Sequence, residues 1–154
     1  MVPLRPKEAD RRFVCDQIYW LVEAPDELSA KSMRHQFAVL KKAWENLSEA
    51  DKEQFPTPQH LRKRALIEAG FYTESAIEVG DQATAGRLAV SLRRRDTFAV
   101  IFVRDGYLFE RVAESQSSMD RERFQKSKDA IFEIVANMIG VSVAELTRES
   151  ERTT

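Results

Sequence analysis

The dipeptide Asp105-Gly106, set between two β-rich apolar runs, constrains the fold more than any other feature of this sequence. The first run covers residues 97–103 and the second covers residues 107–113. Asp-Gly favours the tight two-residue loop of a β-hairpin, because both loop positions there need positive φ. We therefore predict two adjacent antiparallel strands, so the fold of this chain must include a sheet.

Helical periodicity dominates most of the remaining chain. The clearest helix is predicted over residues 29–47, with Ser29 as its N-cap. Its apolar residues recur at intervals of four and three, which places them on one helix face: Met33, Phe37, Leu40, Trp44 and Leu47. This stripe predicts a helix that buries that face in the core.

Further helices are predicted from capping residues and from glycines that follow a last turn. The predicted ranges are 48–55, 57–69, 81–95, 119–139 and 142–148. The N-caps of four of them are Ser48, Thr57, Asp81 and Ser142, while Gly70 and Gly140 end two of them. Ser142 and Glu145 form a capping box.

Two more strands complete the expected fold. One is predicted over residues 13–23, around the aromatic and β-branched run at 18–22, and the other over residues 71–79. The 154 residues suit one domain. We expect an α+β fold with a single globular domain over 1–148, a frayed tail over 149–154, and about four mostly antiparallel strands packed against about four to six helices.

Several classes of function lack the residues they need. Neither a P-loop nor a dinucleotide-binding fingerprint occurs, so no nucleotide cofactor is expected. Cys15, His35 and His60 are too few for a zinc site, and Cys15 cannot form an internal disulfide. Cys15 with either histidine has no specific catalytic pattern, and a small buried thiol is the favoured interpretation. We expect no enzyme, no metal and no cofactor.

The first residues contain Pro3 and Pro6 and lack the apolar stretch of a signal peptide, and the longest apolar runs are short. We therefore expect a cytoplasmic protein without a membrane partner.

Positive charge is concentrated in the middle of the chain. Residues 31–95 contain 12 lysines and arginines against 8 acids, a net charge of +4, whereas the rest has 12 against 17, or −5. Phosphate contacts with single strands need such cations, with aromatic rings for base stacking. The candidate nucleic-acid-binding residues are Lys31, Arg34, His35, Lys41, Lys42, Arg62, Lys63, Arg64, Arg93, Arg94 and Arg95, with Phe71 or Tyr72 as further stacking residues.

Two other interpretations of the basic residues stay open. Lysines and arginines on three solvated helix faces would give the same composition without any ligand. Residues 57–64 also place polar side chains at a helix N-terminus, as in a helix-turn-helix, although Phe55-Pro56 precedes them instead of a short glycine-containing turn.

The sequence resembles a group of uncharacterised phage and prophage proteins. The similarity rests on residues 32–40, which match the group's R-x-H-R-x-F/Y-F-A-x-L helix, and on 55–63, which match its F-P-T-P-E-H-L-R-K helix. Residues 115–119, 124–130 and 138–142 resemble the group's ending.

A weaker similarity extends to the NinB/Orf recombination mediators of lambdoid phages, although Gln36 stands where their motif has a second basic residue. This second resemblance implies a homodimer that binds single-stranded DNA and assists recombinases without catalysis. The expected function is thus a phage-type accessory protein that binds single-stranded DNA, or a recombination or replication partner, through its basic middle. The alternative is an inhibitor or anti-defence factor that contacts a host enzyme.

Overall fold

The computed structural model describes residues 27–152. The chain divides into two compact units, residues 1–35 and 36–154, so the described part of the first unit is only the beginning of one helix. The six α-helices of the described residues are α2 (Glu27–Glu45), α3 (Glu49–Gln54), α4 (Pro58–Glu68), α5 (Gln82–Arg95), α6 (Arg121–Ile139) and α7 (Val143–Arg152). The strands are β1 (Tyr72–Glu78), β2 (Val100–Arg104) and β3 (Tyr107–Ala113), and the 3-10 turn η1 (Gln116–Ser118) precedes α6.

Local capping signals set most helix ends where the sequence predicts them. The Oγ of Ser48 accepts a hydrogen bond from the backbone N–H of Asp51 at 3.1 Å, and Asp81 accepts one from Thr84 at 2.8 Å. That backbone bond is the main cause of the lowered pKa of Asp81. Several bounds differ by a few residues: α2 ends at Glu45 rather than at 47, α6 begins at Arg121 rather than near 119, and β2 begins at Val100 rather than at 97. Helix α2 begins two residues before the predicted cap Ser29, and α7 continues to Arg152 rather than ending near Arg148.

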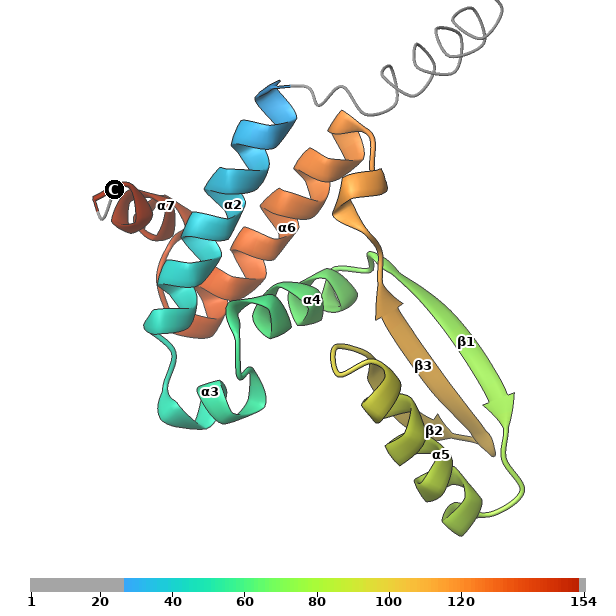
Figure 1. Ribbon diagram of the computed structural model, residues 1–154. Coiled ribbons are helices and arrows are strands. Elements are labelled where there is room, and N and C mark those ends of the chain that lie inside the picture. The colour runs from blue at the N-terminus through green and yellow to red at the C-terminus, as the bar shows by residue number, and fades with distance from the viewer. Residues whose placement is uncertain (1–26, 153–154) are drawn as a thin grey trace, which may run out of the picture. The chain divides into compact units, whose positions relative to one another are not determined.

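The predicted hairpin is confirmed. Asp105 and Gly106 connect β2 to β3 with φ values of 52° and 82°, as a two-residue loop of this type needs. The sheet has the order β1-β3-β2, and both outer strands run antiparallel to β3. Helix α5 connects β1 to β2 (Figure 1). The described residues thus form three strands instead of four, and the strand predicted over 13–23 lies outside them.

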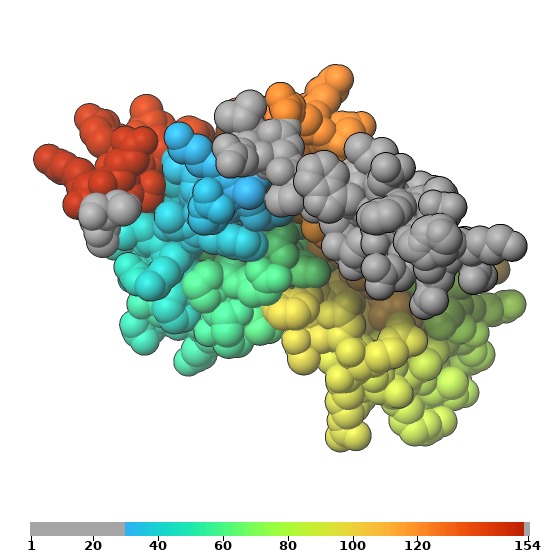
Figure 2. Space-filling model, turned by 45° about the horizontal axis from the view of Figure 1, so that its top comes forward, coloured from blue at the N-terminus to red at the C-terminus, as the bar shows by residue number. Residues whose placement is uncertain are grey.

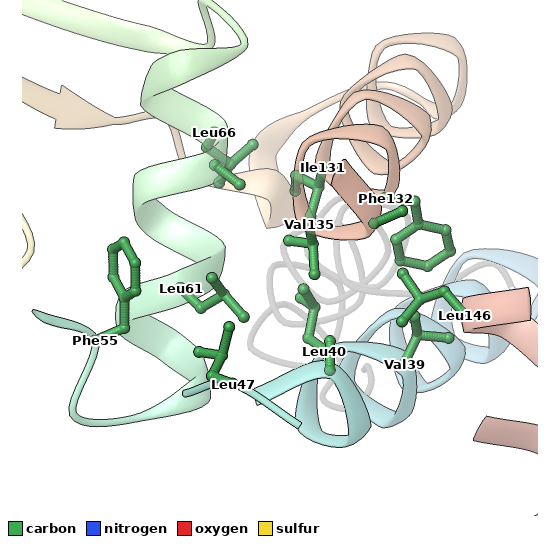
Figure 3. Close-up of a cluster of buried hydrophobic side chains, with 13 residues drawn as sticks. Val39, Leu40, Leu47, Phe55, Leu61, Leu66, Ile131, Phe132, Val135 and Leu146 are labelled. Carbon is green, nitrogen blue, oxygen red and sulfur yellow. The ribbon is translucent and has the colours of Figure 1, made fainter. Parts of the chain in front are cut away.

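The main hydrophobic core lies among the helices. Leu40 of α2, Leu61 of α4 and Ile131 of α6 are all almost fully buried in it, and Leu146 adds a contribution from α7. Figure 3 shows these side chains pointing toward one another from different helices. Phe71, which precedes β1, and Ala113, which ends β3, pack against this cluster and connect the sheet to it.

A smaller cluster holds α5 against one face of the sheet. Ala89 and Leu92 of α5 pack with Leu108 of β3, which is fully buried. The opposite side of α5 is exposed and forms the yellow surface in Figure 2. The predicted inward residues of this helix, Ala85, Leu88, Ala89 and Leu92, are buried or partly buried.

The buried face of α2 is rotated relative to the predicted stripe. Leu40 and Leu47 are buried as predicted, but Phe37 is 46% exposed and Gln36, its polar neighbour, is fully buried. The expectation that Phe37 faces the core is therefore wrong. The reason is a hydrogen-bonding partner for Gln36 that lies 80 residues away in the chain.

Within the described residues, no single helix has the length and apolar character needed to cross a membrane; α6 and α7 meet those criteria only as a pair, across a bend of 91°.

Candidate nucleic-acid interface

The sheet face opposite α5 gathers aromatic and arginine side chains. Phe102 of β2 pairs directly with Phe109 of β3, and directly paired residues project to the same side of a sheet. Leu108 and Glu110 project to the other side, where α5 lies. The side that carries Phe102 and Phe109 is the one opposite α5. We call this surface the aromatic sheet face and define it by Tyr72, Phe102, Arg104, Tyr107, Phe109 and Arg111.

Rings and guanidinium groups on this face form a connected series of contacts. The rings of Phe102 and Phe109 lie 5.1 Å apart at an angle of 16°, and Tyr107 meets Phe109 at 6.4 Å. The guanidinium carbon of Arg111 lies 4.9 Å from the Phe102 ring and 4.7 Å from the Tyr72 ring. Such stacks attract a further flat, polarisable group, because each ring or guanidinium plane offers a π-face.

The two arginines of this face retain hydrogen-bonding capacity. The Nε of Arg111 donates to Glu74 at 2.5 Å, and this bond raises the pKa of Arg111. Within the described residues, the two terminal amino groups of Arg111 have no hydrogen-bond partner. Arg104 is exposed, and its guanidinium carbon lies 5.6 Å from the centroid of the Phe102 ring. Both guanidinium groups can therefore donate hydrogen bonds to phosphate oxygens.

Carboxylates on this face are confined to one edge. Glu74 and Glu78 belong to β1, and β1 is separated from β2 by β3. Arg104 lies on β2, at the opposite edge. An anionic chain would therefore favour the β2 and β3 side of the face, away from Glu78, whereas Glu74 on β1 is paired with Arg111.

The cations predicted on α2 fall into two groups. Lys31 and Arg34 are exposed and His35 is partly buried, and all three belong to the first unit. Lys41 is exposed, whereas Lys42 lines a pocket of about 350 Å³ together with Arg148 and Arg152 of α7.

The three predicted cations of α4 have three different environments. Arg62 is only 7% exposed. Lys63 lies 5.5 Å from the ring of Phe98, which also meets His60 at 4.6 Å. Arg64 pairs with Glu68 on its own helix. Because His60 contacts Phe98 and Gln59 binds Arg62, neither side chain extends freely as base readout by a helix-turn-helix would require.

The three arginines that end α5 are also unequal. Arg95 donates to both carboxylate oxygens of Glu110, at 2.8 and 3.0 Å. Glu110 is 6% exposed, so this carboxylate depends on Arg95 for its charge partner. Arg93 and Arg94 are exposed and form no ion pair with the described residues.

This difference predicts unequal effects on stability. Arg95→Gln should lower the free energy of unfolding by about 1–3 kcal/mol, because it leaves the buried Glu110 without its cation while solvent still reaches the outer part of the pair. Arg93→Gln and Arg94→Gln should each change it by less than about 0.5 kcal/mol. Urea unfolding of the three variants measures the difference, and equal effects would contradict a specific role for Arg95.

A buried polar network lies between the helices. The carboxamides of Gln36 and Gln116 exchange two hydrogen bonds of 2.9 Å, and Gln116 also donates to Ser127 at 2.8 Å and accepts from Arg62 at 2.6 Å. Gln116 lies between the strand predicted over 107–113 and the helix predicted over 119–139, outside any predicted element, so no local pattern indicates this network. Burial of Arg62 lowers its pKa.

Sequence reasoning identified one residue of the aromatic sheet face, Tyr72, as a stacking residue. Its other stacking candidate, Phe71, contacts Arg123 at 4.9 Å and packs on the main core. The period-two alternation of Phe102 with Arg104, and of Tyr107 with Phe109 and Arg111, is visible in the sequence. Only the strand register shows that these two sets share one face.

Within residues 27–152, no group of three or more metal-binding side chains comes together. No family model matches the chain, and no curated protein or solved structure is significantly similar to it. The resemblance to phage proteins therefore stays a prediction.

Proposed function

We propose that this protein binds single-stranded DNA on its aromatic sheet face and acts as a non-catalytic accessory protein of the phage type. The observation that carries the proposal is a connected set of aromatic rings and one guanidinium group on one side of the sheet: Tyr72, Arg111, Phe102, Phe109 and Tyr107. Unstacked bases bind readily to aromatic side chains and guanidinium planes presented by a sheet. Duplex DNA offers no such free base faces, so single strands are the preferred ligand.

The few positive charges of the face favour binding of a single strand mainly by base stacking, with few phosphate contacts. Arg104 and Arg111 are the two cations that can reach phosphates there, while Glu78 limits the β1 edge. For two contacts to a single strand, the logarithm of the binding constant should fall with the logarithm of salt concentration with a slope of about −1.4. A site built from the basic helices would give a steeper slope.

The first test compares variants of single rings by fluorescence anisotropy with labelled oligothymidylate. Phe102→Leu keeps apolar bulk in the strand but removes the stacking ring, and it should weaken binding about 5- to 150-fold, since stacking contributes about 1–3 kcal/mol per base. Val103→Ala alters an exposed side chain on the opposite face and should leave the affinity unchanged. Equal affinities of wild type and Phe102→Leu would contradict the proposal.

A second comparison uses two double variants that each remove two positive charges, one pair from the aromatic sheet face and the other from α5. Arg104→Gln combined with Arg111→Gln removes two cations from the face, and Arg93→Gln combined with Arg94→Gln removes two from α5. The first pair should bring the salt slope close to zero, and the second should leave it near that of wild type. The reverse result would place the ligand on α5. An oligouridylate measured in parallel shows whether DNA is preferred over RNA.

A further inference from the structure

Arg62 is a buried cation without a buried anion. It is 7% exposed, and no carboxylate of the described residues lies within ion-pair distance of it. Its hydrogen-bond partners are the neutral amides of Gln59, at 2.9 Å, and Gln116, at 2.6 Å. Burial of a charge is costly unless an opposite charge accompanies it. The buried positive charge of Arg62 is therefore not balanced by a carboxylate of the described residues.

The guanidinium of Arg62 also has donors to spare. A guanidinium carries five N–H groups, and the two hydrogen bonds to Gln59 and Gln116 use one on Nε and one on a terminal nitrogen. The other terminal nitrogen makes no hydrogen bond with a described residue. A planar fork with free donors is the arrangement that binds a carboxylate or a phosphate.

An exposed aromatic ring lies next to this cation. Phe37 is 46% exposed, and its ring centroid lies 5.7 Å from the guanidinium carbon of Arg62. A large exposed apolar side chain beside a largely desolvated arginine has the composition of a binding hot spot, in which an apolar anchor excludes water from a charged contact. Phe37 and Arg62 belong to α2 and α4, so this pair is separate from the aromatic sheet face.

Because Arg62 is almost fully buried, only an anion on a narrow group can reach its guanidinium. A phosphodiester is joined to a sugar on both sides and needs a wide approach, whereas a side-chain carboxylate ends a short, narrow stem that can reach a recessed guanidinium. We propose that Phe37 and Arg62 form a docking site for a protein segment in which an acidic side chain lies next to an apolar residue. The carboxylate binds Arg62 and the apolar side chain covers Phe37. This second site recruits a protein partner independently of DNA binding.

The probe is a tripeptide, Leu-Glu-Leu, acetylated and amidated so that its only charge is the side-chain carboxylate. Nuclear magnetic resonance of the full ¹⁵N-labelled chain follows the Nε–H signal of Arg62 during titration, with Leu-Gln-Leu as the uncharged match. We expect saturable shifts of this signal with Leu-Glu-Leu at about millimolar concentrations, where small ligands with one charged contact bind. Leu-Gln-Leu should cause none. Equal shifts with both peptides, or none with Leu-Glu-Leu up to about 10 mM, would overturn the proposal.

Variants test the apolar half of the site without altering the buried network. Phe37→Ala should weaken Leu-Glu-Leu binding about three- to tenfold, as the loss of one aromatic contact does. Phe98→Ala removes a ring that contacts His60 and Lys63 rather than Arg62, and it should leave the affinity unchanged. Unchanged binding by Phe37→Ala would remove Phe37 from the site and overturn the docking proposal.

Two further ligands show whether the anion that binds Arg62 belongs to a peptide, a small metabolite or a phosphate group. Phenylacetate carries a carboxylate and a ring in a small molecule, and inorganic phosphate carries the charge of a nucleic-acid backbone. Tighter binding of Leu-Glu-Leu than of either supports a peptide ligand. Tighter binding of phosphate would assign Arg62 to a phosphate group, and tighter binding of phenylacetate would assign it to a metabolite, so either result overturns the peptide assignment.

Discussion

Replacing Gln116 by leucine should lower the free energy of unfolding by about 3–5 kcal/mol, because this one side chain satisfies three buried partners. Its carboxamide binds Gln36 twice, Ser127 once and Arg62 once. Leucine has a similar volume, so packing changes little. The variant leaves an amide and a guanidinium buried with unmet hydrogen bonds, and the guanidinium carries a charge.

Chemical denaturation monitored by tryptophan fluorescence measures the effect of Gln116→Leu. Gln125→Leu is the matched control, because Gln125 is an exposed residue of α6 whose amide, among the described residues, bonds only to Asp129 one turn away. The control should change stability by less than about 0.5 kcal/mol. A loss below about 1 kcal/mol for Gln116→Leu would mean that water or rearrangement replaces the network, and that the network is not a main source of stability.

Leu61→Ala should cost about 3–5 kcal/mol, in the upper part of the range for leucine truncations in cores. Leu61 is fully buried in the cluster that α2, α4 and α6 share with α7, and Figure 3 shows it among side chains of several helices. Because rigid helices surround it, the space left by the lost atoms cannot close easily. Thermal and urea unfolding of the variant give the loss.

Val90→Ala provides the comparison for Leu61→Ala. Val90 is 48% exposed on α5, so truncating it removes little buried area, and alanine is the better helix former. We expect a change within about 0.5 kcal/mol. Similar losses for the two variants would contradict the placement of the main core among the helices rather than around α5.

The parts of the fold that the sequence predicts correctly depend on local interactions. A capping residue such as Thr57 bonds to a backbone group three residues later, and Asp105-Gly106 forms its loop within two residues. These signals are complete within a short window, so they can be recognised without knowledge of the fold. The α+β class and most element bounds follow from them.

The parts that could not be predicted depend on distant partners. Gln36 is buried instead of Phe37, and its hydrogen-bond partner Gln116 lies 80 residues further along the chain. No local sequence pattern indicates that pair. Arg95 differs from Arg93 and Arg94 only because β3 places Glu110 beside it. The aromatic sheet face likewise exists only in the register that aligns Phe102 with Phe109.

The net charge of the middle region did not locate the candidate site; the arrangement of side chains in the fold did. Lysines and arginines of the middle region are visible in the composition, but Arg62, Arg64 and Arg95 are buried or paired in the fold. The face that combines aromatic rings with arginine donors lies partly beyond that region, at Phe102, Arg104 and Arg111.

Photo-crosslinking tests the central claim most directly, because it reports where a bound strand lies rather than whether it binds. Ultraviolet irradiation of the protein with an oligothymidylate of about 15 nucleotides, within the range of site sizes for single-strand binders, is followed by mass spectrometry of the crosslinked peptides. The account predicts crosslinks at Tyr72, Phe102, Tyr107 or Phe109 on the aromatic sheet face. Crosslinks confined to α4 or α5, or no crosslinks at micromolar protein and low salt, would contradict it.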